Sequence, residues 1–519
     1  MSDTNTAAPS RDEEPASAYS WYVLGVLVVV YILNFIDRQI LAILAVDIKR
    51  DLGLTDGDLG FLGGAAFAVF YALFGVPLGR LADRWSRVRL LTIGLLLWST
   101  MTALSGFARN FATLSLARMG VGVGEATASP TAYSLISDYF PSRQRATALA
   151  IYSSGLYIGG GVSLLIGANI SKWWDAAYPE GGLGGLVGWQ AAFVAVGLPG
   201  VLLAGWVASL REPVRQPDPA SGERHPLIDF LIDLSMLLPP LTLIHAALRG
   251  WKAALINLAM AAAMTVFALV MIELTKNPQQ WIAIAFGYYA VFSWATTLRR
   301  HDPATFKLIR GTPAFICTAL GYGLVSLGAY ALAFWSAAYG ERVLGLPKSE
   351  LAFVLGGCGA ASGFLGVILG GRMSDWLRTR NPSGRILVIM FGIVAPIIPI
   401  WVGFTTESSV LFYVMNFLAG MFAATALGAA AATTQDLVLP RMRGTATASF
   451  FLATTLVGLG LGPFMVGAIS DLSGSLRIGV LSLIGVAPIS LVLLTYAYRT
   501  LPKAEATIAE RAARAAAGR

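Results

Sequence analysis

Apolar runs of about 20 residues recur along the whole chain, and each is long enough to cross a bilayer as a helix. The runs are continuous and lack the period-two alternation of membrane β-strands, which excludes a β-barrel. Because lipid offers the backbone no hydrogen-bonding partner, such runs must be helical. Only 13% of the 519 residues are charged, against about 25% in an average soluble domain. The predicted fold class is therefore an all-α polytopic membrane protein.

The apolar runs form two groups of six. The first group predicts spans near 21–44, 59–80, 89–107, 113–138, 146–170 and 190–210, and the second near 312–340, 351–371, 385–404, 409–435, 444–470 and 476–498. Between the groups, 253–274 and 281–298 are two further candidates joined by a turn at Asn277-Pro278. We predict fourteen spans, and the alternative is twelve spans with a surface-lying insert.

The chain is predicted to have five parts. They are a disordered tail (1–20), an N-terminal six-helix bundle (21–210), a central linker with an inserted helical hairpin (211–310, hairpin 253–298), a C-terminal six-helix bundle (311–500) and a basic tail (501–519). The first tail is polar and acidic and lacks the basic start and short apolar core of a signal peptide. The apolar stretch 227–248 carries two aspartates and two prolines, which suit an interfacial or re-entrant segment.

Lys and Arg residues are distributed unevenly among the predicted loops. Most of the 37 lie on one side of the membrane if both tails share that side. Cytoplasmic loops carry the excess of basic residues in membrane proteins. Both tails and both ends of the insert are therefore predicted to be cytoplasmic, in a bacterial inner membrane. The net charge of +8 reflects this topology, and no nucleic-acid partner is expected.

The two groups of spans are related by an internal repeat. At an offset of 292 residues, Leu52-Gly53-Leu54, Asp58-Leu59, Phe61, Gly64, Gly79-Arg80 and Asp83 return as Leu344-Gly345-Leu346, Glu350-Leu351, Phe353, Gly356, Gly371-Arg372 and Asp375. Two homologous halves with a site between them are typical of transporters that work by alternating access. We therefore predict two pseudo-symmetric bundles that rock against each other.

The loop after the second predicted span reads Gly79-Arg80-Leu81-Ala82-Asp83-Arg84-Trp85-Ser86-Arg87. An aspartate among arginines at a helix end suits ion pairs that form in one conformation and break in the other. The second copy keeps the glycine and the aspartate but has Trp376 in place of an arginine. We predict a cytoplasmic gate of Gly79, Asp83, Arg84, Arg87, Gly371 and Asp375. The alternative is that the basic residues only fix topology.

This loop resembles the signature loop of the major facilitator superfamily, although Ser86 stands where glycine is usual. Two further strings, Leu33-Asn34-Phe35-Ile36-Asp37-Arg38 and Arg118-Met119-Gly120-Val121-Gly122-Val123-Gly124-Glu125-Ala126, look like the Spinster family. Animal members of that family export lysophospholipids and sphingoid phosphates, and its bacterial members are taken to be proton-coupled. An aspartate-arginine pair in the first helix also occurs in organic-anion and sugar-acid transporters of the superfamily. The insert departs from the common twelve-span pattern.

Four charged residues, Asp37, Arg38, Arg118 and Glu125, lie within predicted spans. A charge near the bilayer centre costs at least about 2.5–3.5 kcal/mol, so these residues are predicted to be functional. Asp37–Arg118 and Arg38–Glu125 are candidate pairs, and the sequence leaves the pairing open. Withdrawing an arginine during the transport cycle would favour protonation of its carboxylate partner. We therefore predict that the four residues couple transport to protons.

The alternative for these charges is a static ion network that holds the half together. At an offset of 298 residues, Arg118 and Glu125 correspond to Asn416 and Ala423, so the second half does without them. This asymmetry favours coupling chemistry in the first half. The substrate cavity is predicted to be lined by Asn34, Tyr152, Tyr157, Tyr322, Tyr330 and Asn416, although any one aromatic residue is more often ordinary packing.

The predicted function is that of a secondary transporter rather than an enzyme. No nucleophile–base pair is recognisable, the three histidines lack metal-ligand spacing, and no ATP-binding sequence is present. We expect no cofactor, a proton gradient as energy source, a monomer, and an amphipathic or anionic small-molecule substrate such as a lysolipid or sphingoid-type lipid. The alternatives are an organic-anion or sugar-acid proton symporter of the same superfamily and a non-transporting membrane scaffold.

Overall fold

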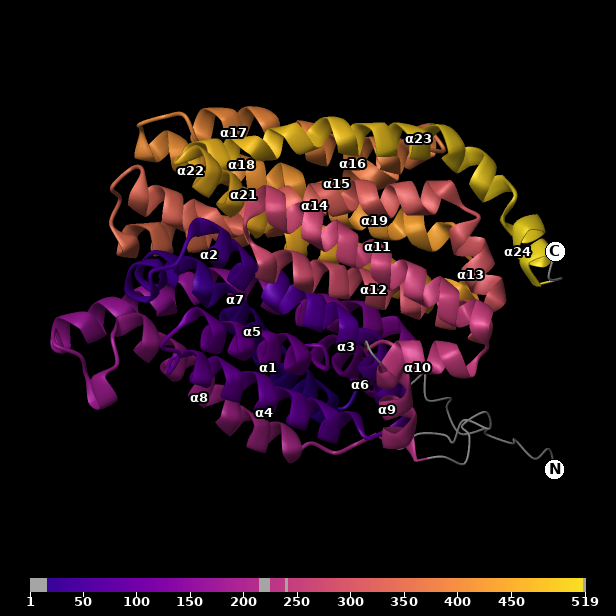
Figure 1. The fold of residues 1–519 in the computed structure, drawn as a ribbon, viewed down its shortest axis with the longest axis horizontal. Coiled ribbons are helices and arrows are strands. Elements are labelled where there is room, and N and C mark those ends of the chain that lie inside the picture. The colour runs from indigo at the N-terminus through magenta and orange to yellow at the C-terminus, as the bar shows by residue number, and fades with distance from the viewer. Residues whose placement is uncertain (1–15, 214–224, 239–240, 517–519) are drawn as a thin grey trace, which may run out of the picture.

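The computed structural model describes residues 16–213, 225–238 and 241–516. In these ranges the chain forms helices that run roughly along one long axis (Figure 1). The first helices form one bundle, the last helices form a second bundle beside it, and the helices of the central stretch lie across both. The prediction of an all-α fold is confirmed.

The N-terminal bundle contains eight helices. They are α1 (Ala18–Leu52), α2 (Asp56–Gly63), α3 (Ala65–Arg84), α4 (Arg87–Ser105), α5 (Phe111–Glu125), α6 (Ala128–Tyr139), α7 (Ser142–Ala177) and α8 (Gly188–Ala208), with a 3₁₀ turn at Leu183–Gly185. The predicted fourth span is divided between α5 and α6. The break lies at Ala126 and Thr127, whose backbone angles stay right-handed helical, so α5 continues into α6 with only a local irregularity.

The central stretch contributes five helices, α9 (Pro226–Ser235), α10 (Leu241–Leu248), α11 (Trp251–Thr275), α12 (Pro278–His301) and α13 (Pro303–Arg310). The apolar stretch 227–248 is thus two short helices rather than one span. In the predicted hairpin, 61% of the apolar window of α12 is buried but only 11% of that of α11. Helix α12 is therefore the inner helix, and α11 lies outside it.

The C-terminal bundle is more segmented. It contains α14 (Pro313–Arg342), α15 (Lys348–Arg380), α16 (Gly384–Val394), α17 (Ile397–Gly403), α18 (Ser409–Ala424), α19 (Ala426–Asp436), α20 (Arg443–Thr454), a π-helical turn (Thr455–Leu459), α21 (Gly460–Ser473), α22 (Leu476–Leu481), α23 (Ala487–Ala506) and α24 (Ile508–Ala516), with 3₁₀ turns at Pro440–Met442 and Ser482–Val486. Several single predicted spans are therefore pairs of helices joined end to end.

Thirteen helical segments in the described part of the chain are long and apolar enough to cross a bilayer. They correspond to every predicted span except the fourth, because neither α5 nor α6 alone has the length of a span. Both helices of the predicted hairpin, α11 and α12, are among the thirteen.

The turns that close the first span of each half have the same backbone geometry. Gly53 ends α1 with φ of 63°, and Gly345 follows α14 with φ of 65°. Glycine enters this left-handed region without steric cost, and it commonly ends helices there. The repeat recognised in the sequence is thus a repeat of conformation as well.

The two bundles are held together at the end that contains these turns. Asp47 pairs with Lys348, and Asp56 lies 2.6 Å from Arg342. The Asp471 carboxylate accepts a hydrogen bond from the Asp56 backbone N–H at 2.9 Å. At the opposite end, each ion pair among the described residues stays within one bundle or joins a bundle to the central stretch. The arrangement is therefore closed at the end predicted to be periplasmic.

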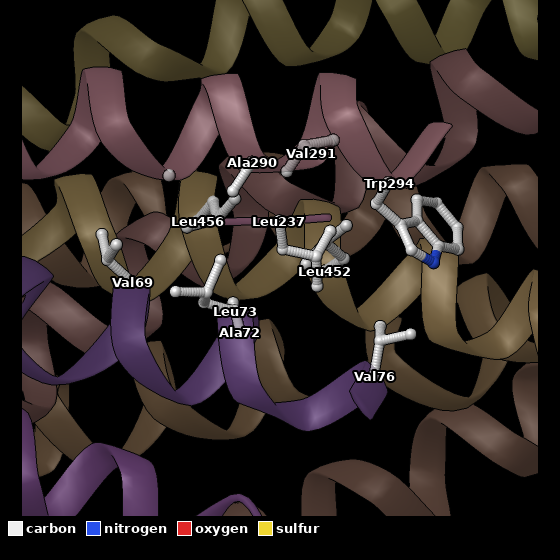
Figure 2. A pocket seen from close by; sticks show the side chains of 11 residues that line it. Val69, Ala72, Leu73, Val76, Leu237, Ala290, Val291, Trp294, Leu452 and Leu456 are labelled. Carbon is white, nitrogen blue, oxygen red and sulfur yellow. The ribbon is translucent and has the colours of Figure 1, made fainter. Parts of the chain in front are cut away.

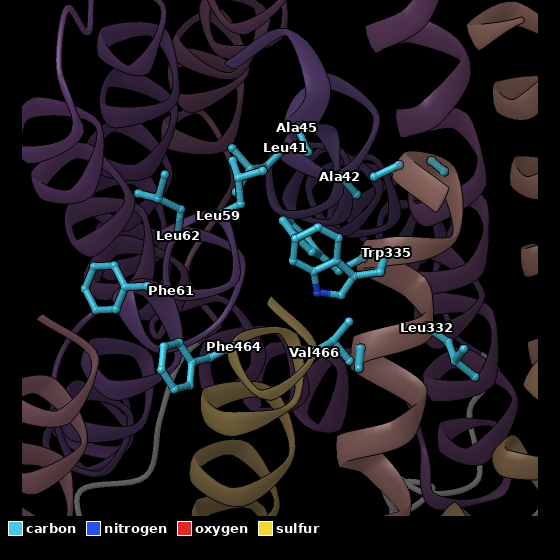
Figure 3. Packing of buried hydrophobic residues seen from close by; sticks show 14 of the residues in the cluster. Leu41, Ala42, Ala45, Leu59, Phe61, Leu62, Leu332, Trp335, Phe464 and Val466 are labelled. Atoms are coloured by element: carbon cyan, nitrogen blue, oxygen red, sulfur yellow. The ribbon is translucent and has the colours of Figure 1, made fainter. Parts of the chain in front are cut away.

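A core shared by both bundles lies behind the closed end (Figure 3). Trp335 of α14 is fully buried and donates its indole N–H to the Pro463 carbonyl at 2.8 Å. Where α2 crosses α21, a Cβ on Gly60 would lie 2.6 Å from Phe464 Cα. Only glycine permits this close approach, which is how small residues tighten helix contacts in membranes.

Helix α12 packs across the seam between the bundles, against α3 and the start of α21. The Gln280 side-chain amide is buried and donates to the Gly460 carbonyl at 2.8 Å. Trp281 meets the edge of Phe464 with ring centroids 5.6 Å apart. The inner helix of the insert is thus part of the packed structure.

Helices extend into both segments that were predicted to be tails, 1–20 and 501–519. Helix α1 begins at Ala18, while residues 1–15 lie outside the described ranges. At the other end, α24 packs on α13. Arg511 donates to the Thr312 hydroxyl, and Ala512 is buried. The packed structure therefore continues beyond residue 500, because the alanine-rich segment has one face that α13 covers.

Candidate functional site

Arg38 on α1 and Glu125 at the end of α5 form a buried ion pair. Arg38 Nη2 lies 2.6 Å from Glu125 Oε2, and Arg38 Nε lies 3.1 Å from the same oxygen. The Glu125 side chain is fully buried, and that of Arg38 is 13% exposed. Of the pairings that the sequence left open, this one is formed. Such charge-assisted hydrogen bonds are about twice as strong as neutral ones.

Glycines of α5 bring Glu125 into this position. A Cβ on Gly122 would lie 2.6 Å from the Phe67 carbonyl oxygen, and one on Gly124 would lie 2.7 Å from the Trp98 backbone nitrogen. Helix α5 therefore packs backbone to backbone against α3 and α4. The close contact explains why the glutamate follows a string of alternating glycines.

Three aromatic rings surround the Arg38 guanidinium. Its central carbon lies 4.5 Å from the centre of the Phe67 ring, 4.8 Å from that of Phe35 and 5.2 Å from that of Tyr71. A cation over aromatic faces is attracted by the ring quadrupole, more strongly when water is excluded. Sequence reasoning missed Phe67 and Tyr71. Their spacing of four residues places them on one face of the second predicted span, which was the available signal.

Arg118 and Asp37 are neighbours without forming a side-chain ion pair. Arg118 Nη1 donates to the Asp37 backbone carbonyl at 3.0 Å, and Nη2 donates to the Arg38 carbonyl at 3.3 Å. Both side chains are buried. The predicted Asp37–Arg118 contact is thus made through the backbone of α1, where Arg118 places a second positive charge beside the Arg38–Glu125 pair.

Several buried polar atoms of this cluster have no hydrogen-bond partner among the described residues. They are Asp37 Oδ1, Glu125 Oε1, Asn34 Nδ2 and Arg118 Nε. A buried polar atom without a partner costs about 1–3 kcal/mol. A carboxylate oxygen held in this way can take up a proton, and a donor held in this way can bind a ligand atom. Both are steps that a coupling site needs.

The structure brings three of the predicted cavity residues to this cluster. Asn34 lies one helical turn before Arg38 on α1. Tyr152 of α7 is buried and stacks on Tyr31 with ring centroids 4.3 Å apart. Tyr330 of α14 packs against the same apolar cluster as Tyr152, so the C-terminal bundle reaches this cluster, and the role of Tyr330 in a cavity stays a prediction.

The other three predicted cavity residues make contacts outside the charged cluster, and their role in a cavity stays a prediction. Tyr157 lies against Gly363 of α15. Tyr322 stacks on Phe450 with ring centroids 5.3 Å apart. The Asn416 amide oxygen accepts a hydrogen bond from the Ser336 hydroxyl at 2.8 Å inside the C-terminal bundle. These contacts are packing contacts of the second half and its seam with α7.

The arginines of the predicted gate pair with two different parts of the molecule. Arg87 is fully buried and binds Asp138 at 2.5 Å and Glu212 at 2.9 Å. Arg84 pairs with Asp229 of α9 at 2.7 Å. None of these pairs reaches the C-terminal bundle, and the role of the six gate residues stays a prediction.

The two glycines of the predicted gate have room around them in this conformation. A Cβ on Gly79 would meet only Pro130 Cβ, at an ordinary 3.9 Å, and one on Gly371 would meet no atom within 4 Å. Close helix approach at Gly79 is therefore not a feature of this arrangement. Asp375 forms no ion pair with the described residues.

The Glu212 carboxylate completes the buried Arg87 cluster. It accepts hydrogen bonds from the Ser86 hydroxyl, the Arg87 guanidinium and the Val88 backbone N–H, each at 2.9 Å. Burial acts to raise the pKa of this carboxyl, but the three donors outweigh it and lower the pKa below its usual 4.5. Glu212 is thus held in its charged form, linking the chain after α8 to the loop before α4.

Two repeated helical bundles, the first of which contains a buried ion cluster, are the architecture of a polytopic secondary transporter. The sequence profile of the Major Facilitator Superfamily matches residues 27–463. The chain belongs to this superfamily, and within it the relatives below make it Spinster-like.

Three relatives illustrate the range of similar proteins. An MFS-type efflux pump of Mycolicibacterium smegmatis is 27% identical over 453 residues, which cover 87% of this chain and 85% of the relative. Protein spinster homolog 1 of Bos taurus is 26% identical, over 88% of this chain and 74% of the relative. A probable L-galactonate transporter of Escherichia coli is 30% identical over 34% of this chain and 36% of the relative.

The fold also matches a solved structure. A bacterial homolog of the human lysosomal transporter Spinster, in an inward-facing and unoccupied conformation, superposes with a TM-score of 0.68 at 26% identity. The match covers 96% of this chain and 99% of the other. In the predicted topology the closed end is periplasmic, which would make this arrangement inward-facing as well.

Proposed function

We propose that this chain is a proton-coupled secondary transporter that moves an amphipathic anionic solute by alternating access. The observation that supports it is the buried Arg38–Glu125 pair, with Asp37 and Arg118 at its side and unpartnered acceptor atoms around it. The second half lacks this cluster, because Asn416 stands where Arg118 is expected. A cluster confined to one half suits coupling better than a network required by the fold.

Proton coupling follows from competition for the carboxylates. While Arg38 binds Glu125, that carboxylate is compensated and remains charged. When the bundles rock and Arg38 turns toward a substrate, Glu125 is left in an apolar site and takes up a proton to avoid the cost of a buried charge. A proton gradient thus supplies the energy, and no other cofactor is needed. Asp37 is the second acceptor.

The Arg38 guanidinium is the proposed contact for the anionic group of the substrate. It is the most exposed member of the cluster, and the rings of Phe35, Phe67 and Tyr330 supply apolar surface beside it. A headgroup on the cation and a hydrocarbon tail on the rings describe a lysolipid or sphingoid-type lipid. A sugar acid is the second candidate, supported by similarity to the L-galactonate relative, and it would need polar partners in place of the rings.

We further propose that the protein works as a monomer in a bacterial inner membrane with both ends of the chain cytoplasmic. The uneven distribution of Lys and Arg supports this orientation. In it, the ion pairs of Asp47 and Asp56 close the periplasmic side, and the gate loops lie on the open cytoplasmic side.

Uptake into proteoliposomes tests the proposal. Lysolipids, sphingoid lipids and organic acids are offered with and without an inward proton gradient, to wild type, Asp37→Asn and Glu125→Gln. The amide variants keep the shape and remove the titration, so gradient-driven uptake is expected to fall to background while exchange without a gradient persists. Glu407→Gln, at an exposed carboxylate, is the control. Gradient-driven uptake at the wild-type rate by both amide variants would favour the static ion network instead.

A further inference from the structure

An apolar cavity lies at the seam between α3, α12 and the π-helical turn (Figure 2). Leu73 and Val76 of α3 line one side, and Trp294 of α12 and Leu452 of α20 line the other. Figure 2 shows the Trp294 indole at one edge of this space, with its ring nitrogen pointing away from the leucines. The cavity belongs to both bundles and to the insert at once.

A second, larger cavity of about 360 Å³ adjoins the first. Both are lined by Val291, Trp294, Leu452 and Leu456, so they lie on two sides of the same residues. The larger one extends between α12, α13, α14 and α20 toward Arg310, the only charged residue in its lining. No residue of the Arg38–Glu125 cluster lines either cavity, so this space is separate from the proposed transport site.

Arg310, in the lining of the larger cavity, is one of four cations near the junction of α12 and α13. Arg299 and Arg300 end α12, and Lys307 and Arg310 lie on α13. None of the four forms an ion pair with a residue that the structure describes. Burial and the neighbouring Arg300 lower the pKa of Arg249, so a further cation lies close to Arg300. The nearby Asp302 carboxylate caps α13 through Thr305. Arg310 therefore lines an otherwise apolar cavity without a paired carboxylate among the described residues.

We propose that this cavity binds an anionic phospholipid of the surrounding bilayer, with an acyl chain against Trp294 and Leu452 and the phosphate on Arg310. A basic residue at the membrane surface favours an anionic headgroup, and an aromatic- and leucine-lined space behind it excludes water but accepts hydrocarbon. A zwitterionic lipid fits the apolar part equally well, but its ammonium group offsets the phosphate charge and weakens its attraction to the cations. The bound lipid fills the junction between α3, the insert and the C-terminal bundle, where it ties the three together.

The position of Trp294 between the two cavities supplies a direct readout. The protein is placed in phosphatidylcholine nanodiscs in which an equal fraction of lipid is replaced by phosphatidylglycerol or phosphatidylcholine brominated on the acyl chain, because bromine quenches indole fluorescence on contact. The chain has 13 tryptophans, so the signal of Trp294 is the difference between wild type and Trp294→Phe. From this signal we expect the cavity to bind phosphatidylglycerol about fivefold more tightly than phosphatidylcholine. This ratio is the effect of one basic residue near a bilayer surface.

Two variants and one control separate the site from general attraction to anionic lipid. Arg310→Gln is expected to abolish the preference for phosphatidylglycerol, and Ala453→Phe, which fills the cavity lining, is expected to reduce quenching by both lipids. Lys307→Gln removes an equal charge from the same helix at an exposed position outside the lining, and it should keep the preference. Thermal unfolding midpoints establish that the variants are folded.

Equal quenching by the two brominated lipids in the wild type would overturn the proposal. So would loss of the preference in Lys307→Gln to the same extent as in Arg310→Gln, since that result describes a diffuse basic surface. Relief of quenching by a lysolipid that is itself transported would assign the cavity to substrate instead of a bilayer lipid. These outcomes do not depend on proton coupling, so the proposed transport mechanism is tested separately.

Discussion

Arg87 and Asp138 form a 2.5 Å ion pair in the N-terminal bundle, and Arg385 and Asp436 repeat it at an offset of 298 residues. Each pair joins two helices of its own bundle. A contact that both copies of a repeat retain, and that stays within each copy, belongs to the repeated fold. The position of Arg87 therefore favours a structural role, in contrast to Arg38 and Glu125, whose pair the second half lacks.

A structural role predicts that Arg87→Gln destabilises the protein. The variant leaves Asp138 and Glu212 without their shared partner, and a hydrogen bond to a charged group contributes about 1.5–3 kcal/mol. The thermal unfolding midpoint in detergent should fall clearly, and Arg385→Gln should lower it as well. The distances between the two bundles, which distinguish the inward-open from the outward-open state, should not change. A shifted distance distribution at unchanged stability would instead place Arg87 in the gate.

We expect the stability of the folded protein to depend on pH through the Glu212 carboxyl. Its pKa is lowered in the folded protein because the hydrogen bonds from Ser86, Arg87 and Val88 outweigh the effect of burial. Its contribution is therefore complete above the usual pKa of 4.5 and is lost as pH falls through the lowered value. Unfolding midpoints measured from neutral to acidic pH should fall more steeply in wild type than in Glu212→Gln. The exposed Glu180→Gln should follow the wild-type curve.

Helix α9 is held to α3 by two parallel ion pairs, Arg80–Asp233 at 3.0 Å and Arg84–Asp229 at 2.7 Å. Both arginines are partly exposed, so each pair contributes about 0.2–1 kcal/mol. Arg84→Glu should therefore raise amide exchange in 226–235 by up to about fivefold. Adding Asp229→Arg should restore protection, whereas the exposed control Arg89→Glu should have no effect. Unaltered exchange in Arg84→Glu would mean that apolar packing alone holds α9.

The basic residues at the two ends of hairpin α11–α12 predict on which side of the membrane its tip lies. Arg249 and Lys252 lie at its start and Arg299 and Arg300 at its end, so both outer ends are expected on the cytoplasmic side. A reporter fused at Asn277 should read periplasmic, and fusions at Gly222 and His301 should read cytoplasmic. A cytoplasmic signal at Asn277 would leave α11 and α12 on one side of the membrane and exclude fourteen spans.

Much of the fold could be predicted from the sequence because its signals are local. Apolar runs fix the helices, and the 292-residue repeat fixes the two bundles, down to the matching turns at Gly53 and Gly345. The candidate pair Arg38–Glu125 followed from depth along antiparallel helices. Its aromatic surroundings did not, because Phe67 and Tyr71 become neighbours of Arg38 only when α5 glycines draw α3 inward.

Contacts between distant segments escaped sequence reasoning for the same reason. The local sequence of α9 does not indicate that Asp229 and Asp233 pair with Arg84 and Arg80. The sequence around Asn416 likewise does not indicate that its amide oxygen accepts a hydrogen bond from Ser336. The break between α5 and α6 was not predicted either, although Pro130 in the first turn of α6 has no N–H to donate to the Ala126 carbonyl. Tertiary packing decides such features, while composition and periodicity report only on single elements.

The last prediction concerns Asp56, which lies where the two bundles close. Its side chain is buried and accepts from Lys49 at 2.5 Å, from Arg342 at 2.6 Å and from the Ser470 hydroxyl at 2.6 Å. The contacts to Arg342 and Ser470 cross between the bundles and exist only while this end is closed. Asp56→Asn weakens them by roughly 1.5–3 kcal/mol, the usual worth of a hydrogen bond to a charged group.

This loss should raise the outward-open population about tenfold or more relative to the wild type. Spin labels at Arg50 and Leu472, both exposed at the closed end of opposite bundles, report the opening as a second, longer distance, once Cys317 and Cys358 are replaced by serine. Asp175→Asn is the matched control, because Asp175 accepts from the Gly188 N–H inside the N-terminal bundle and crosses no seam. If Asp56→Asn and Asp175→Asn give the same distances as the wild type, apolar packing around Trp335 closes this end and the ion pairs do not.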